Sequence, residues 1–258
     1  MKKRTGSRTI IGQWNMYAEL YDRNMGKNGD IFHQEIIDPA LFEIIGNFDG
    51  TTVLDAGCGN GYLTYYISNL GATNVIGIDG SPKLIQIAST NLSNPKIQFQ
   101  SADLTQTWPL KDGTIDIIVA NMVLQYISDL ATFAQEAKRV LKPQGAITFS
   151  IDHPSHMLFM HALKLAGLPN TKFQEDLPYF ETAYCLKKSL WDQAILGYYH
   201  RTLEEYTTSF FKVGFSLTAL KELGRTTNIG PISEIIPRVV ILKFRNIHSY
   251  NVAISGTG

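Results

Sequence analysis

The chain has 258 residues, of which 44% are hydrophobic and 18% charged, so it can bury a sizeable core, and disorder is excluded as its main state. Its length suits one α/β domain that carries an insertion or cap. Lysine and arginine together number 23, as do aspartate and glutamate, and the resulting net charge of zero disfavours a nucleic acid as the main partner.

The first predicted element is a helix over residues 12–22. Trp14, Tyr17, Ala18 and Tyr21 follow the spacing i, i+3, i+4 and i+7, which places their side chains on one helix face. Taken by itself, this pattern indicates the apolar stripe of a helix that packs against the rest of the protein.

A regular alternation of strands and helices begins at residue 51. Strands are predicted over 51–57, 74–79, 96–103, 114–121 and 146–151, and helices over 61–71, 83–92 and 129–145. The helix boundaries carry local signals, namely Gly71 at the end of the first helix, Ser81 and Pro82 before the second, and Pro143 and Gly145 at the end of the third. Because the strands are nearly unbroken in apolar residues, we expect a parallel sheet with helices on both faces.

The alternation lapses over residues 152–200 and resumes at Thr202. There the sequence T-L-E-E predicts a capping box that begins a helix, which stops at Gly214. Two more strands are predicted over 215–223 and 237–244. The polar tail after Arg245 is given no structure.

The segment that carries chemistry is a glycine loop, V-L-D-A-G-C-G-N-G, at residues 53–61. It follows a strand and precedes a helix, and Gly57, Gly59 and Gly61 permit a tight turn that a ligand can approach closely. Asp55 precedes the first glycine. A nucleoside cofactor bound without a phosphate contact suits this loop.

Two other classes of glycine loop fit poorly. A P-loop needs a lysine, and this loop has none. The dinucleotide fingerprint needs a third glycine where this chain has Tyr62 or Thr64, depending on the register. The missing third glycine nearly excludes a nicotinamide-dependent dehydrogenase.

The loop resembles the first motif of the class I S-adenosylmethionine-dependent methyltransferases, and the resemblance continues through residues 12–245. It is strongest to the small-molecule group that includes the type 11 and ubiquinone/menaquinone-type enzymes. It implies an α/β, Rossmann-like, doubly wound seven-stranded sheet whose last strand is antiparallel. It also implies S-adenosylmethionine as cofactor, S-adenosylhomocysteine as product, and methyl transfer by in-line displacement to a small-molecule acceptor.

The resemblance also implies how the chain is organised. We expect a helical lid at 1–50, a cofactor-binding core at 51–151, a cap or acceptor-pocket insertion at 152–200 between the fifth strand and the last helix, a C-terminal helix and strands at 201–245 that complete the core, and a tail at 246–258.

Family roles can be carried over to the strand ends one residue at a time. Asp79 is expected to accept hydrogen bonds from the ribose hydroxyls, or otherwise to be an acid at a helix N-terminus. Asp103 is expected to accept from the adenine amino group, with the backbone of Leu104 beside it, or otherwise to be a solvated loop residue. Asn121 is expected to offer its carbonyl to the methionine amino group, while Met122 closes over the adenosine.

Further cofactor contacts are expected from the loop and the lid. The predicted set includes Gly57, Cys58, Gly59 and Gly80, and Asp55 is expected either to order the loop or to meet the cofactor amine. Tyr17 and Tyr21 are expected to cover the cofactor, where an aromatic face favours a sulfonium, unless they belong only to the apolar stripe of a packed helix.

Residues 152–200 are enriched in side chains that suit an acceptor pocket. They hold four of the six histidines and eight of the 28 aromatic residues. The aromatic residues are Phe159, Phe173, Tyr179, Phe180, Tyr184, Trp191, Tyr198 and Tyr199. We expect this segment either to form the pocket or to be a small subdomain with its own core.

Two histidines of this segment are candidate catalytic bases. His153 and His200 match family positions and are expected to take the acceptor proton. His153, His156 and His161 form only a weak metal-binding pattern, so we predict no metal site.

The acceptor is expected to be a small molecule rather than a nucleic acid or a membrane. The turn after the fourth strand lacks the Pro-Pro pair typical of enzymes that methylate amino groups of nucleic-acid bases. No stretch approaches ~18 consecutive apolar residues, and no apolar segment follows the basic start. The two cysteines, Cys58 and Cys185, form no disulfide framework, so we expect a cytoplasmic protein. We expect it to be a monomer or homodimer. The alternative is a protein of this fold that binds S-adenosylmethionine but has lost methyl transfer or uses the cofactor for another reaction.

Overall fold

A seven-stranded mixed sheet forms the centre of the protein in a computed structural model that describes residues 6–156, 179–180, 182–188, 195–224 and 237–247. The strands lie in the order β3-β2-β1-β4-β5-β9-β8. Their bounds are β1 (Thr52–Ala56), β2 (Asn74–Asp79), β3 (Ile97–Ser101), β4 (Ile115–Asn121), β5 (Leu141–Asp152), β8 (Phe215–Leu223) and β9 (Val239–Asn246).

The direction of the strands confirms the predicted sheet. β1 to β5 run parallel to one another, whereas β9, the last strand in the described part of the chain, is antiparallel to both β5 and β8. The apolar runs predicted for the parallel strands are buried, for example at Val53, Leu54 and Ile118. Helices cover both faces, which is why these strands lack polar alternation.

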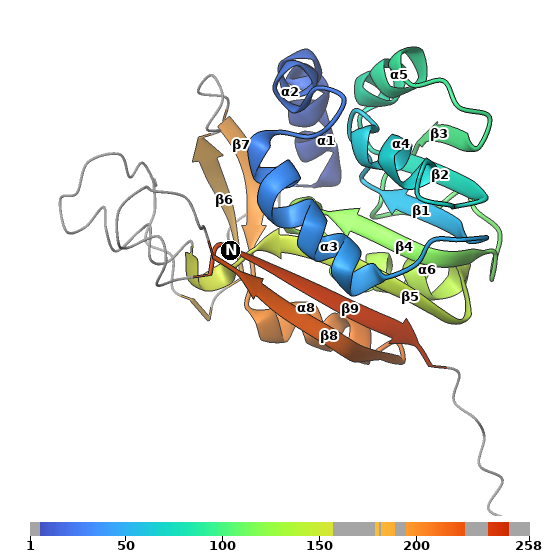
Figure 1. The fold of residues 1–258 in the computed structure, drawn as a ribbon. Helices are drawn as coiled ribbons and strands as arrows, with labels where there is room; N and C mark the ends of the chain where they lie inside the picture. Colours follow the sequence, from blue (N-terminus) through green and yellow to red (C-terminus); the bar gives the residue numbers. More distant parts are fainter. Residues whose placement is uncertain (1–5, 157–178, 181, 189–194, 225–236, 248–258) are drawn as a thin grey trace, which may run out of the picture.

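Helices lie on both faces of this sheet, and further helices lie beyond them. They are α1 (Ser7–Met16), α2 (Ala18–Met25), the π-helix η1 (His33–Ile37), α3 (Asp38–Ile45), α4 (Tyr62–Ser68), α5 (Pro82–Asn91), the 3₁₀ turn η2 (Leu124–Tyr126), α6 (Leu130–Val140) and α8 (Leu203–Phe211). Figure 1 shows α3 across one face of the sheet and α6 and α8 behind the other. Across the described ranges, no helix combines the length and the apolar character that crossing a bilayer requires.

Each face of the sheet has its own apolar core. On the face of α3 and α4, Leu41 and Ile67 pack with Val53 of β1. On the opposite face, Phe133 of α6 and Phe210 of α8 belong to the cluster that includes Leu54. Alternate residues of β1 therefore serve the two cores, as a strand buried on both sides requires.

A second, two-stranded sheet stands apart from the main one. It pairs β6 (Ala183–Lys188) with β7 (Ile195–His200) in antiparallel fashion. β7 contacts α1 and η2, and Figure 1 shows the hairpin beside the N-terminal helices. The sequence does not predict this hairpin, because its strands lie where the periodic pattern lapses.

Two predicted helices differ from the structure. Residues 12–22 form parts of α1 and α2, with Tyr17 at the junction, where its N–H donates to the Gln13 carbonyl and its carbonyl accepts from Tyr21. The helix predicted over 129–145 ends at Val140, because the chain then enters β5 and Leu141 pairs with Ile115 of β4.

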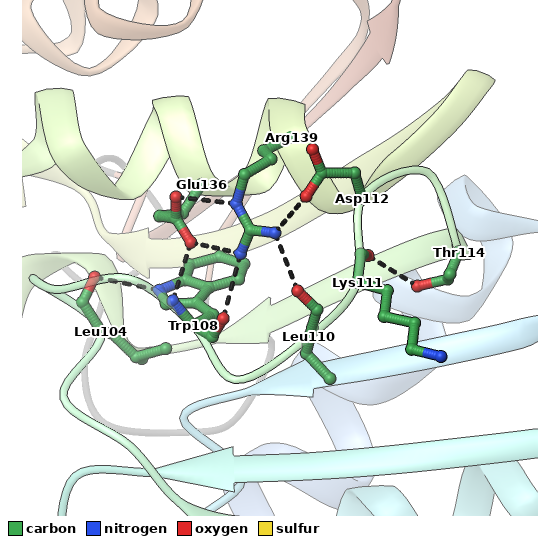
Figure 2. A network of polar contacts seen from close by, with 8 residues as sticks. All are labelled: Leu104, Trp108, Leu110, Lys111, Asp112, Thr114, Glu136 and Arg139. Atoms are coloured by element: carbon green, nitrogen blue, oxygen red, sulfur yellow. Dashed lines mark hydrogen bonds and ion pairs between the residues drawn. The ribbon is translucent and has the colours of Figure 1, made fainter.

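An arginine of α6 holds the long connection between β3 and β4 against the sheet. The Arg139 guanidinium donates to the carbonyls of Trp108 and Leu110, at 3.0 and 2.8 Å, and to the carboxylates of Asp112 and Glu136 (Figure 2). Glu136 in turn accepts the Trp108 backbone N–H at 2.7 Å. Because the Trp108 indole donates to the carbonyl of Leu104, this cluster also fixes the residue beside Asp103.

We predict that Arg139→Met lowers the free energy of unfolding by roughly 2–3 kcal/mol, because several charge-assisted hydrogen bonds are lost together. Thermal and urea unfolding measure the change. Lys111→Met is the matched control, since the exposed Lys111 side chain points away from the cluster in Figure 2. Equal stability of the two variants would contradict this role for Arg139.

Candidate functional site

The glycine loop joins β1 to α4 in a conformation that needs glycine. Gly57 and Gly59 have φ values of 83° and 56°, which favour a residue without a side chain. A Cβ on Gly57 would lie 2.4 Å from Val123. The N–H groups of Gly57 and Cys58 both donate to the Ile78 carbonyl, at 2.7 and 3.0 Å, so the loop is bound to the end of β2.

Asp79 holds the loop from the end of β2. One carboxylate oxygen accepts the Gly59 N–H at 3.0 Å, and the other accepts the Ser81 N–H at 2.8 Å. Burial raises the pKa of Asp79, and these two N–H groups oppose the rise. A carboxylate has about four acceptor positions, so both oxygens retain capacity for the ribose hydroxyls predicted to bind there.

Asp55 is a deeply buried carboxyl group at the start of the loop. Its side chain is 1% exposed and accepts a hydrogen bond from the Thr64 hydroxyl at 2.6 Å. Burial raises the pKa of Asp55 to about 7, and repulsion from Asp79 and Asp38 adds to the rise. Asp55 therefore orders the start of α4 through Thr64 and adds negative potential beneath the loop.

The carboxyl end of β4 is fixed by a chain of hydrogen bonds. The Ser150 hydroxyl of β5 donates to the Asn121 side-chain oxygen and accepts the Met122 N–H at 2.9 Å. Met122 has a φ of 56°, which is uncommon for a residue other than glycine. This backbone conformation is held by its surroundings and directly follows Asn121, whose carbonyl is predicted to meet the cofactor's amino group.

Asp38 is a site residue that the sequence did not reveal. It begins α3 and accepts hydrogen bonds from the Tyr62 hydroxyl at 3.3 Å and the Asn121 amide at 3.2 Å. Burial raises the pKa of Asp38 to about 6. Asp38 and Asn121 are 83 positions apart and share no local motif, so only the fold brings them together.

The predicted adenine end is bound to the N-terminal helix. One oxygen of Asp103 accepts the N–H and the hydroxyl of Thr105, at 2.9 and 2.7 Å, and the other accepts the Ser7 hydroxyl at 2.8 Å. Leu104, beside it, is buried. The same helix approaches Gly80, where an added Cβ would lie 2.8 Å from Ile11.

The N-terminal helices cover the glycine loop. The Tyr21 ring lies so close to Gly59 that an added Cβ would be 3.0 Å from it. Asn60 donates to the Asp22 carboxylate at 2.9 Å and to the Gly26 carbonyl at 2.8 Å, a link that sequence reasoning missed. Tyr17 is half-buried at the junction of the two helices. Tyr21 thus lies over the glycine loop, and its contact with the cofactor stays a prediction.

The hairpin and the turn after β4 contact the N-terminal helices. The Trp14 ring contacts those of Tyr21 and Tyr126 edge-on, with centroid separations of 5.4 and 5.0 Å. Tyr126 packs against the cluster of Tyr198 and Cys185. The Gly197 N–H of β7 donates to the Gln13 side chain of α1 at 2.9 Å. Aromatic side chains therefore connect the glycine loop to the hairpin. We call this series, Tyr21, Trp14, Tyr126 and Tyr198, the aromatic wall.

The two predicted bases have different surroundings. In His153, Nδ1 accepts the Ser155 N–H at 3.2 Å and Nε2 lies 2.9 Å from Glu222, so both ring nitrogens have protein partners. In His200, Nε2 lies 3.1 Å from the Tyr179 carbonyl. That nitrogen carries the proton of the neutral ring, which leaves the lone pair on Nδ1.

Part of the predicted acceptor segment lies outside the described residues. This applies to His161, Phe159, Phe173 and Trp191. The described part of the segment contributes the hairpin and both candidate bases.

Comparison with known proteins gives consistent matches. A family model for a methyltransferase domain matches residues 54–149. The chain is 30% identical over 186 residues to the malonyl-[acyl-carrier protein] O-methyltransferase of Buchnera aphidicola subsp. Baizongia pistaciae, covering 70% of this chain and 72% of that protein. It is 29% identical over 196 residues to the trans-aconitate 2-methyltransferase of Azoarcus sp. strain BH72, covering 72% and 71%. The crystal structure of the [4+2]-cyclase SpnF superimposes with a TM-score of 0.66 at 16% identity, covering 94% of this chain and 96% of that one.

We predict that Asp79→Ala weakens binding of S-adenosylhomocysteine at least tenfold, because a charge-assisted hydrogen bond contributes about 1.5–3 kcal/mol. Calorimetric titration of the folded variant measures the loss. Unchanged affinity would show that Asp79 only organises the loop and the N-terminus of α5.

We also predict that affinity for S-adenosylmethionine rises between about pH 5.5 and 8. The pKa values of Asp38 and Asp55 are about 6 and 7 in the ligand-free protein, and a cationic ligand favours their ionised forms. Binding near pH 6.5 should therefore release protons, which calorimetry in buffers of different ionisation enthalpy detects. Asp55→Asn should reduce the release, and proton uptake would contradict the prediction.

Proposed function

The chain belongs to the class I S-adenosylmethionine-dependent methyltransferases of the type 11 family, and within it we propose that this protein transfers a methyl group to a small-molecule acceptor by in-line displacement. The observation that carries the proposal is the Asp79 carboxylate bound to the Gly59 N–H at 3.0 Å, which places an acid from the end of β2 against the glycine loop. This arrangement suits a nucleoside whose ribose faces the acid and whose remainder crosses the loop.

The proposed site holds the cofactor at three points. Asp79 accepts from the ribose, Asp103 from the adenine amino group, and the Asn121 carbonyl from the ammonium group. The bound cofactor supplies a methyl group on a positively charged sulfur that leaves as a neutral thioether. The protein's main contribution is to align the acceptor with that methyl group and to exclude water.

The acceptor side is proposed to lie along the part of the aromatic wall formed by Trp14, Tyr126 and Tyr198. These side chains come from α1, η2 and β7, so the lid and the hairpin together limit the size of the acceptor. A wall of this kind suits an apolar or flat small molecule. We also propose that the protein acts in the cytoplasm as a monomer or homodimer, a compartment that suits the buried thiols of Cys58 and Cys185.

Of the two candidate bases, the geometry favours His200. Its Nδ1 retains a lone pair, whereas both nitrogens of His153 are engaged. Since alternate residues of a strand share a face, His200 lies on the same side of β7 as Tyr198. We therefore propose that His200 takes the proton of an acceptor that must lose one, and that His153 contributes by positioning the end of β5.

A second candidate function is a different reaction on the same cofactor scaffold. The fold similarity to a [4+2]-cyclase favours considering it, since one fold supports several chemistries. Formation of S-adenosylhomocysteine distinguishes the two functions, because only methyl transfer produces it stoichiometrically with a methylated product.

The test is a transfer assay with S-adenosylmethionine that carries a deuterated methyl group, incubated with the protein and a small-molecule extract of the source cell. Mass spectrometry should find a deuterated metabolite and an equal amount of S-adenosylhomocysteine. Cofactor binding without either product would favour the second function. Absence of cofactor binding would refute both.

We predict that His200→Ala lowers turnover by about 10²–10⁴-fold and leaves cofactor affinity within about twofold, because a general base acts on the acceptor and not on the cofactor. Single-turnover transfer and calorimetry measure the two effects. His153→Ala is the matched comparison. A larger loss of turnover in this variant than in His200→Ala would identify His153 as the base. Wild-type turnover in both variants would show that transfer needs neither histidine.

A further inference from the structure

We infer that Asp38 is a positioning residue of the cofactor site, which fixes the carboxyl end of β4 and supplies a negative charge that favours the cofactor's ammonium group there. The inference rests on the proposed function, because it assumes that S-adenosylmethionine occupies the site. It adds an acidic residue to a binding site otherwise assigned to the glycine loop, the strand ends and the tyrosines of the N-terminal helices.

The first support is a closed triangle of hydrogen bonds. One oxygen of Asp38 accepts from the Tyr62 hydroxyl and from the Asn121 amide, and that amide also donates to the Tyr62 hydroxyl at 3.0 Å. Tyr62 is the first residue of α4, directly after the glycine loop, and Asn121 is the last residue of β4. Asp38 therefore joins the two segments predicted to enclose the amino-acid end of the cofactor.

The second support is that the Asn121 side chain is held at both of its polar atoms. Its nitrogen binds Asp38 and Tyr62, while its oxygen accepts from the Ser150 hydroxyl. The side chain is thus engaged within the protein. The cofactor's ammonium group is left with the backbone carbonyl, whose orientation depends on the following residue, Met122, held at a φ of 56°.

The third support is the charge around Asp38. The carboxyl group is 8% exposed, and Asp55 lies near enough for the two to repel. His33 is the nearby group whose positive charge would favour the Asp38 carboxylate, and its Nδ1 already lies 2.7 Å from Asp30. Burial raises the pKa of Asp38 to about 6, so the ligand-free protein holds this charge at a cost. A bound ammonium group would offset that cost.

A structural role alone would not require an acid. Asparagine at position 38 keeps an oxygen that can accept from Tyr62 and Asn121, so it preserves the triangle and removes the charge. Asp38→Asn therefore separates packing from electrostatics.

Three ligands test the inference by binding alone. S-adenosylhomocysteine carries the ammonium group without the sulfonium, S-adenosylmethionine carries both, and 5′-methylthioadenosine lacks the whole amino-acid end. We expect Asp38→Asn to weaken the binding of S-adenosylhomocysteine and S-adenosylmethionine by about tenfold or more. The affinity for 5′-methylthioadenosine should stay within about twofold of the wild-type value. The ligand-free variant should melt at the same temperature as the wild type or higher, because a buried carboxyl group has been removed.

Asp116→Asn is the matched control. Asp116 lies at the opposite end of β4, where it accepts hydrogen bonds from Lys142 and from the Thr52 N–H. Its replacement should change the affinities for the three ligands equally or not at all. If Asp38→Asn does not fold, Asp38→Ser replaces it in the same comparison. Unchanged binding of S-adenosylhomocysteine by the folded variant would overturn the inference, as would an equal loss for 5′-methylthioadenosine. Failure of the wild type to bind any of the three would instead refute the proposed function.

Discussion

Strand order reverses between β1 and β4, so the connections that leave these two neighbours run to opposite faces of the sheet. The glycine loop turns at the carboxyl end of β1. Because parallel strands end at one edge, Asp79 of β2 and Asn121 of β4 reach the same region from either side of β1. The conformation of the loop and the packing of the N-terminal helices over it both depend on this edge.

Charge within the site differs from charge over the whole chain. The net charge is zero, yet Asp38, Asp55 and Asp79 lie close together beneath or beside the glycine loop, and burial raises the pKa of each. Such a group of acids is unfavourable in the ligand-free protein and favourable toward a ligand that carries a sulfonium and an ammonium group. This electrostatic pattern links the fold to a cationic nucleoside rather than to a phosphate.

The sequence predicted the parts of the structure that obey local rules. Ser81 caps α5 and Thr202 caps α8 as expected, each by accepting an N–H three residues ahead, and the strands followed from their apolar runs. It did not predict the break at Tyr17, because the spacing of Trp14, Tyr17, Ala18 and Tyr21 continues across the junction of α1 and α2. Nor did it predict the roles of Asp38 and Asn60, whose partners lie 83 and 38 positions away. Such contacts leave no periodic signal, and the β6–β7 hairpin likewise lies in a segment without one.

The central claim is that the glycine loop and Asp79 form the binding site for the nucleoside part of S-adenosylmethionine. A crystal structure of the protein with S-adenosylhomocysteine tests it most directly. The account predicts both ribose hydroxyls within about 2.6–3.2 Å of the Asp79 carboxylate oxygens, with the ligand's amino-acid end toward Asn121. A ligand bound elsewhere would contradict the account. So would a ribose turned away from Asp79, with the carboxylate oxygens bound only to the N–H groups of Gly59 and Ser81.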